Sequence, residues 1–180
     1  NLKNEAVVLV KSCIQCQQLN IIKKGYNPLR LITATLPGDS WGIDLAGPLK
    51  TSLKGNNYLL IMVDIATRFC VLRPIPDKTS MTIVKELVDL FSHYGLPRVI
   101  QSDNGTEFVN ELMTLLAENA GFEHRLISSY HPRANGVSER WVQSSVNTIK
   151  KQIRGAIADW DLYVPTTQLY LNTKCNERTM

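Results

Sequence analysis

The stretch LPRVIQSDNGTEFV, residues 96–109, joins a short apolar strand pattern to a helix pattern through a tight turn. Asp103, Asn104 and Gly105 occupy that turn. Asp-Asn-Gly is a strong turn signal by itself, so a plain connection is one interpretation. The other is that the turn presents the Asp103 carboxylate at the end of a strand, where it could bind a metal ion. The rest of the chain has to decide between the two.

Apolar spacing on both sides of this stretch predicts the order strand, strand, strand, helix, strand, helix, strand, helix, helix. The second and third strands form an antiparallel hairpin, and the first helix begins at Thr79 or Ser80 and ends at Gly95. The order predicts an α/β fold with a mixed five-stranded sheet and helices on both faces, and it resembles a ribonuclease H-like fold. The predicted strands are 41–46, 58–63, 69–72, 98–101 and 123–127, and the helices are 79–95, 108–121, 136–154 and 159–172.

The first three of the four predicted helices have an apolar stripe that should pack on the sheet. The first helix has it at Val84, Leu87, Val88 and Phe91. The second has it at Phe108, Leu112, Leu115 and Leu116, and the long third helix has it at Val142, Val146, Ile149 and Ile153.

Two further carboxylates belong with Asp103. Asp44 lies between Ile43 and Leu45 in an apolar strand, where an unpaired carboxylate is costly, although a buried Asp satisfied by backbone donors is a common outcome. If the first and fourth strands are neighbours, Asp44 and Asp103 meet where ligands gather in α/β sheets. Glu139, on the long helix, could join them. Three converging carboxylates repel one another unless divalent cations bind them, and Mg²⁺ or Mn²⁺ suits such oxygen ligands.

A second face of the long helix is polar. From Arg133 to Arg154 the only acid is Glu139, among five basic residues. A lone acid among cations fits a metal ligand beside a nucleic-acid backbone, whereas the alternative is an ordinary solvated helix face. The polar face consists of Glu139, Gln143, Asn147, Lys150 and Arg154.

The composition limits the classes of protein to which the chain can belong. Of the 180 residues, 44% are hydrophobic, which is ample for a core, and no apolar run approaches the ~20 residues that span a bilayer. The net charge of +4 lies entirely in residues 1–30. This basic segment could bind an anionic polymer, or it could be a solvated tail. The first residue is not Met, and we expect a piece of a longer protein. Four cysteines with one close pair favour a reduced, intracellular compartment.

Three blocks of sequence resemble the signature blocks of retroviral and gypsy-type retrotransposon integrases. They are residues 41–48 (WGIDLAGP), 102–108 (SDNGTEF) and 130–140 (YHPRANGVSER). The 35 residues from 104 to 138 separate Asp103 from Glu139, which matches the family's D,D-35-E spacing. The resemblance implies a polynucleotidyl transferase and endonuclease that trims retroelement DNA ends and joins them to target DNA in the nucleus, as a homodimer or higher oligomer without a membrane partner.

The resemblance also implies roles for individual residues. Asp44 and Asp103 would share one Mg²⁺ or Mn²⁺ ion, and Asp44 and Glu139 would hold the second. Asn104 and Gly105 would shape the turn that presents Asp103, and Gly136 would act as a hinge of the loop over 128–135. The residues expected to lie against DNA are Asn104, Gly105, Tyr130, His131, Arg133, Asn135, Gln143, Asn147, Lys150 and Arg154.

The N-terminal arm is similar to the second half of the family's HHCC zinc module. Cys13 and Cys16 match its two cysteines, but its paired histidines would lie upstream of residue 1. A structural zinc site needs four ligands, so we expect free thiols in this chain and zinc only in a longer one. The expected organisation is a remnant of the module over 1–24, a linker over 25–40 and a catalytic core over 41–180.

Three other interpretations compete with an active integrase. A host-domesticated derivative would bind DNA or protein partners without catalysis, and it would usually have lost a carboxylate, which this chain has not. A related nuclease of the same fold would cut without joining. A non-enzymatic assembly domain would use only the surfaces through which such cores dimerise.

Overall fold

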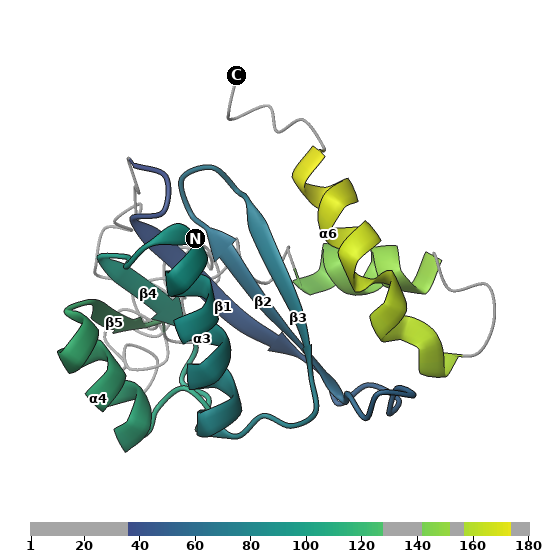
Figure 1. The fold of residues 1–180 in the computed structure, drawn as a ribbon, viewed down its shortest axis with the longest axis horizontal. Helices are drawn as coiled ribbons and strands as arrows, with labels where there is room; N and C mark the ends of the chain where they lie inside the picture. The colour runs from purple at the N-terminus through teal and green to yellow at the C-terminus, as the bar shows by residue number, and fades with distance from the viewer. Residues whose placement is uncertain (1–35, 128–141, 152–156, 174–180) are drawn as a thin grey trace, which may run out of the picture. The chain divides into compact units, whose positions relative to one another are not determined.

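Five strands form one mixed sheet in the computed structural model, which describes residues 36–127, 142–151 and 157–173 (Figure 1). The strand order across the sheet is β3-β2-β1-β4-β5. β1 is antiparallel to β2, and β2 to β3, whereas β4 is parallel to both β1 and β5. The strands are β1 (Ser40–Ala46), β2 (Tyr58–Asp64), β3 (Cys70–Ile75), β4 (Val99–Ser102) and β5 (Glu123–Leu126).

The predicted sheet is confirmed, including the hairpin of β2 and β3 and the adjacency of β1 and β4. Seven of the ten strand bounds differ from the prediction, six of them by one residue. β1 begins one residue earlier, at Ser40, and β3 runs three residues further, to Ile75. The extension includes Pro74, which the edge position of β3 tolerates because the strand has a neighbour on one side only.

Helices cover both faces of the sheet, as predicted. α3 (Ser80–Tyr94) and α4 (Glu111–Ala120) pack on one face, around Ile43, Leu60 and Met62. The helix over 142–151, the 3₁₀ helix η1 (Ile157–Tyr163) and α6 (Val164–Thr173) belong to the other face, around Ile61 and Val63. Figure 1 shows α3 and α4 in front of the sheet and α6 beside β3.

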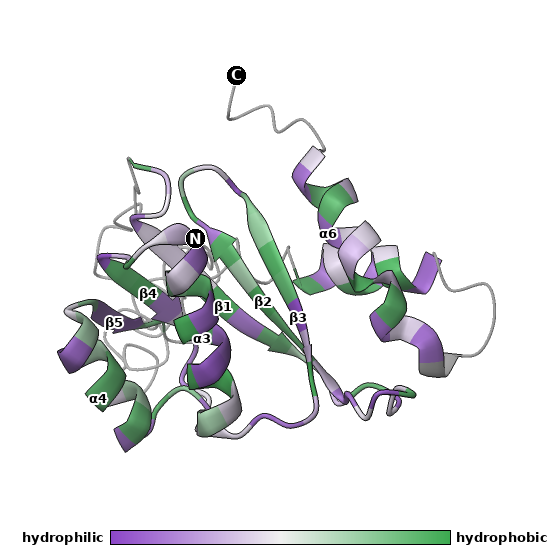
Figure 2. Ribbon diagram, in the orientation of Figure 1, coloured by the Kyte–Doolittle hydropathy of each residue, from purple (hydrophilic) through white to green (hydrophobic). Residues whose placement is uncertain are grey.

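Successive side chains of a strand point to opposite faces of the sheet, which explains why there is a hydrophobic core on each face. Trp41 and Ile43 point to the α3 face, and Ala46 points to the α6 face. Residues 59–63 of β2 are all buried because both sides of that strand are covered, as the continuous apolar pattern predicts. Figure 2 shows β2 as largely hydrophobic and the edge strand β5 as hydrophilic.

Local signals place both ends of α3 and the C-terminal end of α4 where the sequence predicts them. α4 begins at Glu111 rather than at 108, and the last predicted helix is divided into η1 and α6. Thr79 caps α3 by accepting a hydrogen bond from the Thr82 backbone, and Gly95 follows the last turn with φ 85°. Asn110 caps α4, which ends at the left-handed Gly121. Pro165 falls in the first turn of α6, where its missing N–H costs little, and the 3₁₀ helix η1 precedes it.

Two predicted apolar stripes are partly wrong. In α3 the buried residues are Ile83, Leu87 and Leu90, whereas Val88 is half exposed. Phe108 is buried but lies before α4 rather than in its stripe. Met113 is the buried residue of α4, and Leu115 is exposed. Both helices contain more apolar positions than the sheet can cover, so hydrophobicity alone does not identify the inward side.

Cys70, in β3, is a buried free thiol, and its burial raises the pKa to about 12. Such a thiol is chemically inert. No helix within the described ranges has both the length and the apolar character needed to span a membrane.

Candidate active site

Asp44 lies near the carboxyl end of β1, and the strand alternation directs its side chain to the face of the 142–151 helix. Its neighbours Ile43 and Trp41 belong to the opposite core, and Ala46, two residues on, belongs to the same face as Asp44. The carboxylate is partly exposed, and its Oδ1 accepts a hydrogen bond from the Leu45 backbone N–H at 2.8 Å. Asp44 is therefore a half-buried acid at the end of a central strand.

Asp103 follows β4 directly, beside Asp44. The parallel register of β1 and β4 ends with Gly42 opposite Gln101. Continuing that register by two residues sets Asp44 level with Asp103 on neighbouring strands, which lie about 4.8 Å apart in a sheet. The buried Gln101 amide donates to Ser40 Oγ at 3.2 Å and holds the two strands together on this face. The meeting of Asp44 and Asp103 stays a prediction, and the parallel pairing of β1 with β4 is the observation that favours it.

A compact turn then fixes the Asp103 carboxylate. Its Oδ1 accepts the Gly105 backbone N–H at 3.0 Å, and the Gly105 carbonyl accepts the N–H groups of Phe108 and Val109, both at 2.9 Å. A Cβ on Gly105 would lie 2.9 Å from Glu107 Cδ and 3.1 Å from Asp103 Oδ1. An alanine at this position would therefore force the Glu107 side chain or the Asp103 carboxylate to shift. Asn104 is exposed beside them.

The helix over 142–151 carries part of the predicted DNA-binding surface. Val142, Val146 and Ile149 pack against the core on the Asp44 face, as predicted, and Ile153 lies outside the described residues. The polar side of this helix is solvent-exposed, and its described members are Gln143, Asn147 and Lys150.

Several predicted site residues fall outside the part of the chain that the structure describes. They include the third carboxylate, Glu139, so its meeting with Asp44 remains a prediction. The others are the loop residues Tyr130, His131, Arg133 and Asn135, the hinge Gly136, the helix residue Arg154, and the zinc-module cysteines Cys13 and Cys16.

One contact near Asp103 has no counterpart in the sequence predictions. Ser102 Oγ donates to the Asp103 carbonyl oxygen at 2.9 Å and lies 2.8 Å from His124 Nε2. Ser102 is buried, and burial lowers the pKa of His124 below its usual value. The only sequence feature that points to this contact is a histidine in a short edge strand. It indicates a contact with Ser102 only once the pairing of β4 with β5 is known.

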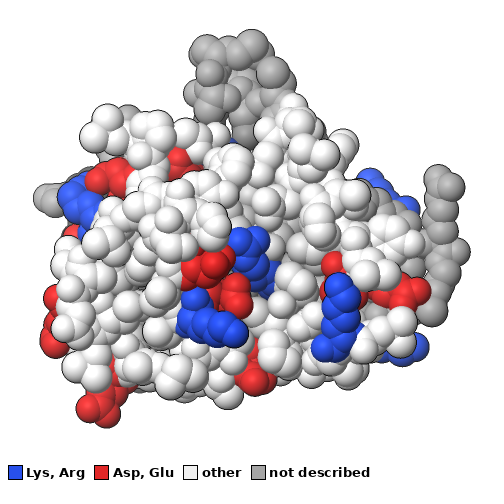
Figure 3. Space-filling view, in the orientation of Figure 1, with Lys and Arg blue, Asp and Glu red and all other residues white. Residues whose placement is uncertain are grey.

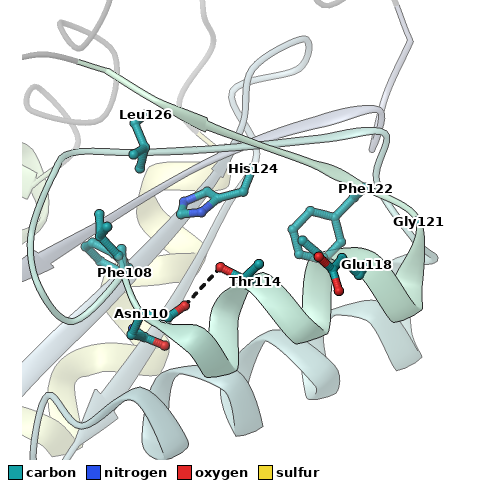
Figure 4. Close-up of a pocket in the computed structure, with 10 residues that line it drawn as sticks. Phe108, Asn110, Thr114, Glu118, Gly121, Phe122, His124 and Leu126 are labelled. Carbon is teal, nitrogen blue, oxygen red and sulfur yellow. Dashed lines mark hydrogen bonds between the residues drawn. The ribbon is translucent and has the colours of Figure 1, made fainter.

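His124 also lines a hollow of about 430 Å³ between α4 and β5. In Figure 4 its ring projects into this hollow between Phe108 and Phe122. Asn110 lies at the start of α4, where it accepts the Met113 N–H at 3.0 Å, and its carbonyl accepts the Thr114 hydroxyl at 3.2 Å. The hollow belongs to the α4 side of the sheet, whereas Asp44 belongs to the opposite face.

Charges on the α3 face are mixed. Figure 3 shows basic and acidic side chains interspersed over this face. Arg73 lies 3.5 Å from Glu86 and 3.2 Å from Asp89, which is a typical surface network with little expected effect on stability. This pattern gives the α3 face no predominantly basic character for DNA binding.

The donor set at the ends of β1 and β4 fits a hard divalent cation. Both side chains are carboxylates, one oxygen of each accepts a backbone N–H, and both lie at the carboxyl ends of strands. Among the described residues, no three His, Cys, Asp or Glu side chains lie together as a metal site.

A scan against protein-family models matches residues 34–132 to the integrase core domain, over more than half of the chain. The chain is a member of the integrase core domain family. The match covers Asp44 and Asp103, and the strand order described above supports it.

Curated relatives of this integrase core are retroviral polyproteins. It is 31% identical to the Pro-Pol polyprotein of simian foamy virus type 3 (strain LK3) over 173 residues, which are 96% of the chain. It is 29% identical to the Gag-Pol polyprotein of feline leukemia virus over 159 residues, or 87% of the chain. The chain spans only 15% and 9% of these two polyproteins, respectively.

Solved structures support the fold of the integrase core. The catalytic core domain of BIV integrase aligns with a TM-score of 0.62 at 18% identity, over 77% of this chain and 86% of that one. The HTLV-2 integrase catalytic core domain, solved in complex with magnesium in a trimeric form, aligns with a TM-score of 0.65 at 17% identity. That alignment covers 82% of this chain and 94% of the other. The ribonuclease H-like fold is thereby established.

Proposed function

We propose that this chain is the catalytic core of an integrase, a metal-dependent polynucleotidyl transferase that trims the 3′ ends of a retroelement DNA and joins them to target DNA. The observation that carries the proposal is the placement of Asp44 and Asp103 at adjacent strand ends, within a chain of the integrase core family. Glu139, at the family spacing, is proposed as the third ligand.

Asp44 and Asp103 would bind two Mg²⁺ or Mn²⁺ ions together with Glu139, with Asp44 shared between them. Bound ions would supply positive charge at the attacking and leaving oxygens of the phosphoryl transfer. The backbone donors Leu45 N–H and Gly105 N–H orient one oxygen of each aspartate, so neither carboxylate has to reorganise when charge develops. Zinc would belong only to a longer chain in which Cys13 and Cys16 meet two histidines.

The DNA would lie over the carboxyl ends of β1 and β4 and along the polar side of the 142–151 helix. Gln143, Asn147 and Lys150 are exposed there, and side chains of these types contact phosphates without reading sequence. We further propose that the protein acts in the nucleus as a dimer or higher oligomer.

The test is cutting and joining of a branched DNA substrate with Mn²⁺ or Mg²⁺. We expect activity in the unmodified protein, none in Asp44→Asn and Asp103→Asn, and none in Glu139→Gln. Asp39→Asn is the matched control, because Asp39 lies at the opposite end of β1 and pairs with Arg98 at 3.0 Å. Metal-independent activity would contradict the proposal. An inactive unmodified protein that still binds DNA would instead favour the domesticated derivative.

A further inference from the structure

Two residues connect the α4 side of the sheet to Asp103, the proposed metal ligand. His124 in β5 contacts Ser102 at the end of β4, and Ser102 contacts the backbone of Asp103. We infer that His124 is a positioning residue for Asp103, acting through the Ser102 hydroxyl. This inference rests on the proposed function, because it assigns the residue that holds one of the proposed metal ligands in place.

The positions of the hydrogen atoms in the His124–Ser102–Asp103 series of hydrogen bonds can be assigned. The Ser102 hydroxyl has one hydrogen, and the Asp103 carbonyl oxygen, 2.9 Å away, can only accept it. The contact with His124 Nε2 at 2.8 Å therefore requires the hydrogen on the imidazole. Burial keeps the ring predominantly neutral near neutral pH, with its single hydrogen on Nε2.

This arrangement restrains Asp103 at both its backbone and its carboxylate. The hydroxyl of Ser102 holds the Asp103 carbonyl, and the Gly105 N–H holds Oδ1. The Ser102 carbonyl in turn accepts the Ile127 N–H at 2.8 Å, so the end of β4 is also tied to the segment after β5. Without the imidazole, the Ser102 hydroxyl can rotate away and the turn that aims the carboxylate is no longer held.

The side chain of His124 has space for replacement. It faces the hollow between α4 and β5, next to Phe108 and Leu126, rather than a tightly filled core. His124→Gln places an amide N–H near the position of Nε2, and His124→Leu keeps an apolar side chain without a donor. Ser102→Ala removes the hydroxyl that links His124 to Asp103 and leaves the imidazole in place.

Two measurements on these variants test the inference. The first is kcat and KM on the branched DNA with Mn²⁺. The second is the backbone amide ¹H–¹⁵N signal of Gly105 in the protein without DNA or metal. We expect His124→Leu and Ser102→Ala each to lower kcat roughly tenfold, with KM changed by less than about twofold, as for loss of one hydrogen bond that aligns a reacting group. Both should shift the Gly105 signal, and His124→Gln should preserve both properties.

Other results would overturn the inference. They are an unchanged kcat and Gly105 signal in His124→Leu and Ser102→Ala, or equal losses in His124→Gln and His124→Leu. If His124→Leu does not fold, as judged by its thermal transition, the comparison of Ser102→Ala with the unmodified protein decides. If the unmodified protein has no activity, the proposed function fails and the Gly105 signal alone tests the positioning role.

Discussion

At the scale of single residues, the orientation of the Asp103 carboxylate depends on the close packing around it. In the turn 103–105 the Asp103 carboxylate accepts the Gly105 N–H, and a Cβ on Gly105 would meet both this carboxylate and the Glu107 side chain. Glu107 in turn lies 3.5 Å from Lys78. The sequence predicts this turn, because Asp-Asn-Gly after a strand has few alternatives. The Ser102–His124 contact could not be predicted, because it depends on the register of two strands 22 residues apart in the chain.

Gly105→Ala should impair the site more than the fold. The added Cβ would meet Asp103 Oδ1 at 3.1 Å, so either the carboxylate moves or the turn opens. We expect a fall of about tenfold or more in kcat on branched DNA, with a smaller relative change in the free energy of unfolding measured with urea. Thr106→Ala, at the next and exposed position, is the control and should behave as the unmodified protein. Full activity of Gly105→Ala would show that Asp103 has more freedom than the structure indicates.

His124 should also make stability depend on pH. Its pKa in the folded protein lies below the ordinary value of 6.5 because burial disfavours the charged ring. The unfolded chain therefore binds the proton first as the pH falls. The stability that His124 contributes is complete above that ordinary value and is lost as the pH falls through the folded pKa.

Urea unfolding between about pH 7.5 and pH 5 measures this effect. The free energy of unfolding should fall toward acid in the unmodified protein and fall less in His124→Gln. Every other titratable group is common to both proteins, including Glu118, which lines the same hollow and is exposed. Parallel profiles for the two proteins would contradict the burial of His124.

At the scale of elements, α6 protects an edge of the sheet. Among the described strands none lies on the outer side of β3, so some backbone groups of β3 point away from β2. Asn172 accepts the Cys70 N–H and donates to the Cys70 carbonyl, both at 2.8 Å, and Gln168 accepts the Leu72 N–H at 2.8 Å. Amide side chains on a helix thus replace a neighbouring strand. Nothing in the local sequence indicates this role, since both residues look like ordinary polar helix positions.

Asn172→Ala should therefore destabilise the protein more than a typical polar helix substitution. Two hydrogen bonds are lost at once, so we expect the free energy of unfolding to fall by ~2 kcal/mol, about 1 kcal/mol for each. Asn119→Ala in α4 is a matched control, because Asn119 makes one exposed hydrogen bond, to the Leu115 carbonyl. Chemical denaturation of both variants gives the comparison. An equal, small loss in each would mean that water replaces the Asn172 contacts.

At the scale of the whole molecule, the order of strands and helices along the chain predicts the sheet topology, because each connection allows few placements of the next strand. A hairpin joins β2 to β3, and the segments with α3 and α4 return the chain to parallel neighbours. The inward faces of α3 and α4 were less predictable, since Val88 and Leu115 are as apolar as the residues that are buried. The strand order alone makes β1 and β4 neighbours, which is the basis for predicting that Asp44 and Asp103 meet. The position of Glu139 relative to them is still a prediction, although the helix after it packs on the Asp44 face.

The most direct measurement is anomalous diffraction from crystals of this chain soaked in Mn²⁺. The account predicts a manganese peak at the carboxyl ends of β1 and β4, within about 2.3 Å of carboxylate oxygens of both Asp44 and Asp103. It also predicts that this peak disappears in Asp103→Asn crystals treated in the same way. Manganese that binds elsewhere and leaves both aspartates without a metal contact would contradict the account, as would a peak at the same place that the substitution does not affect.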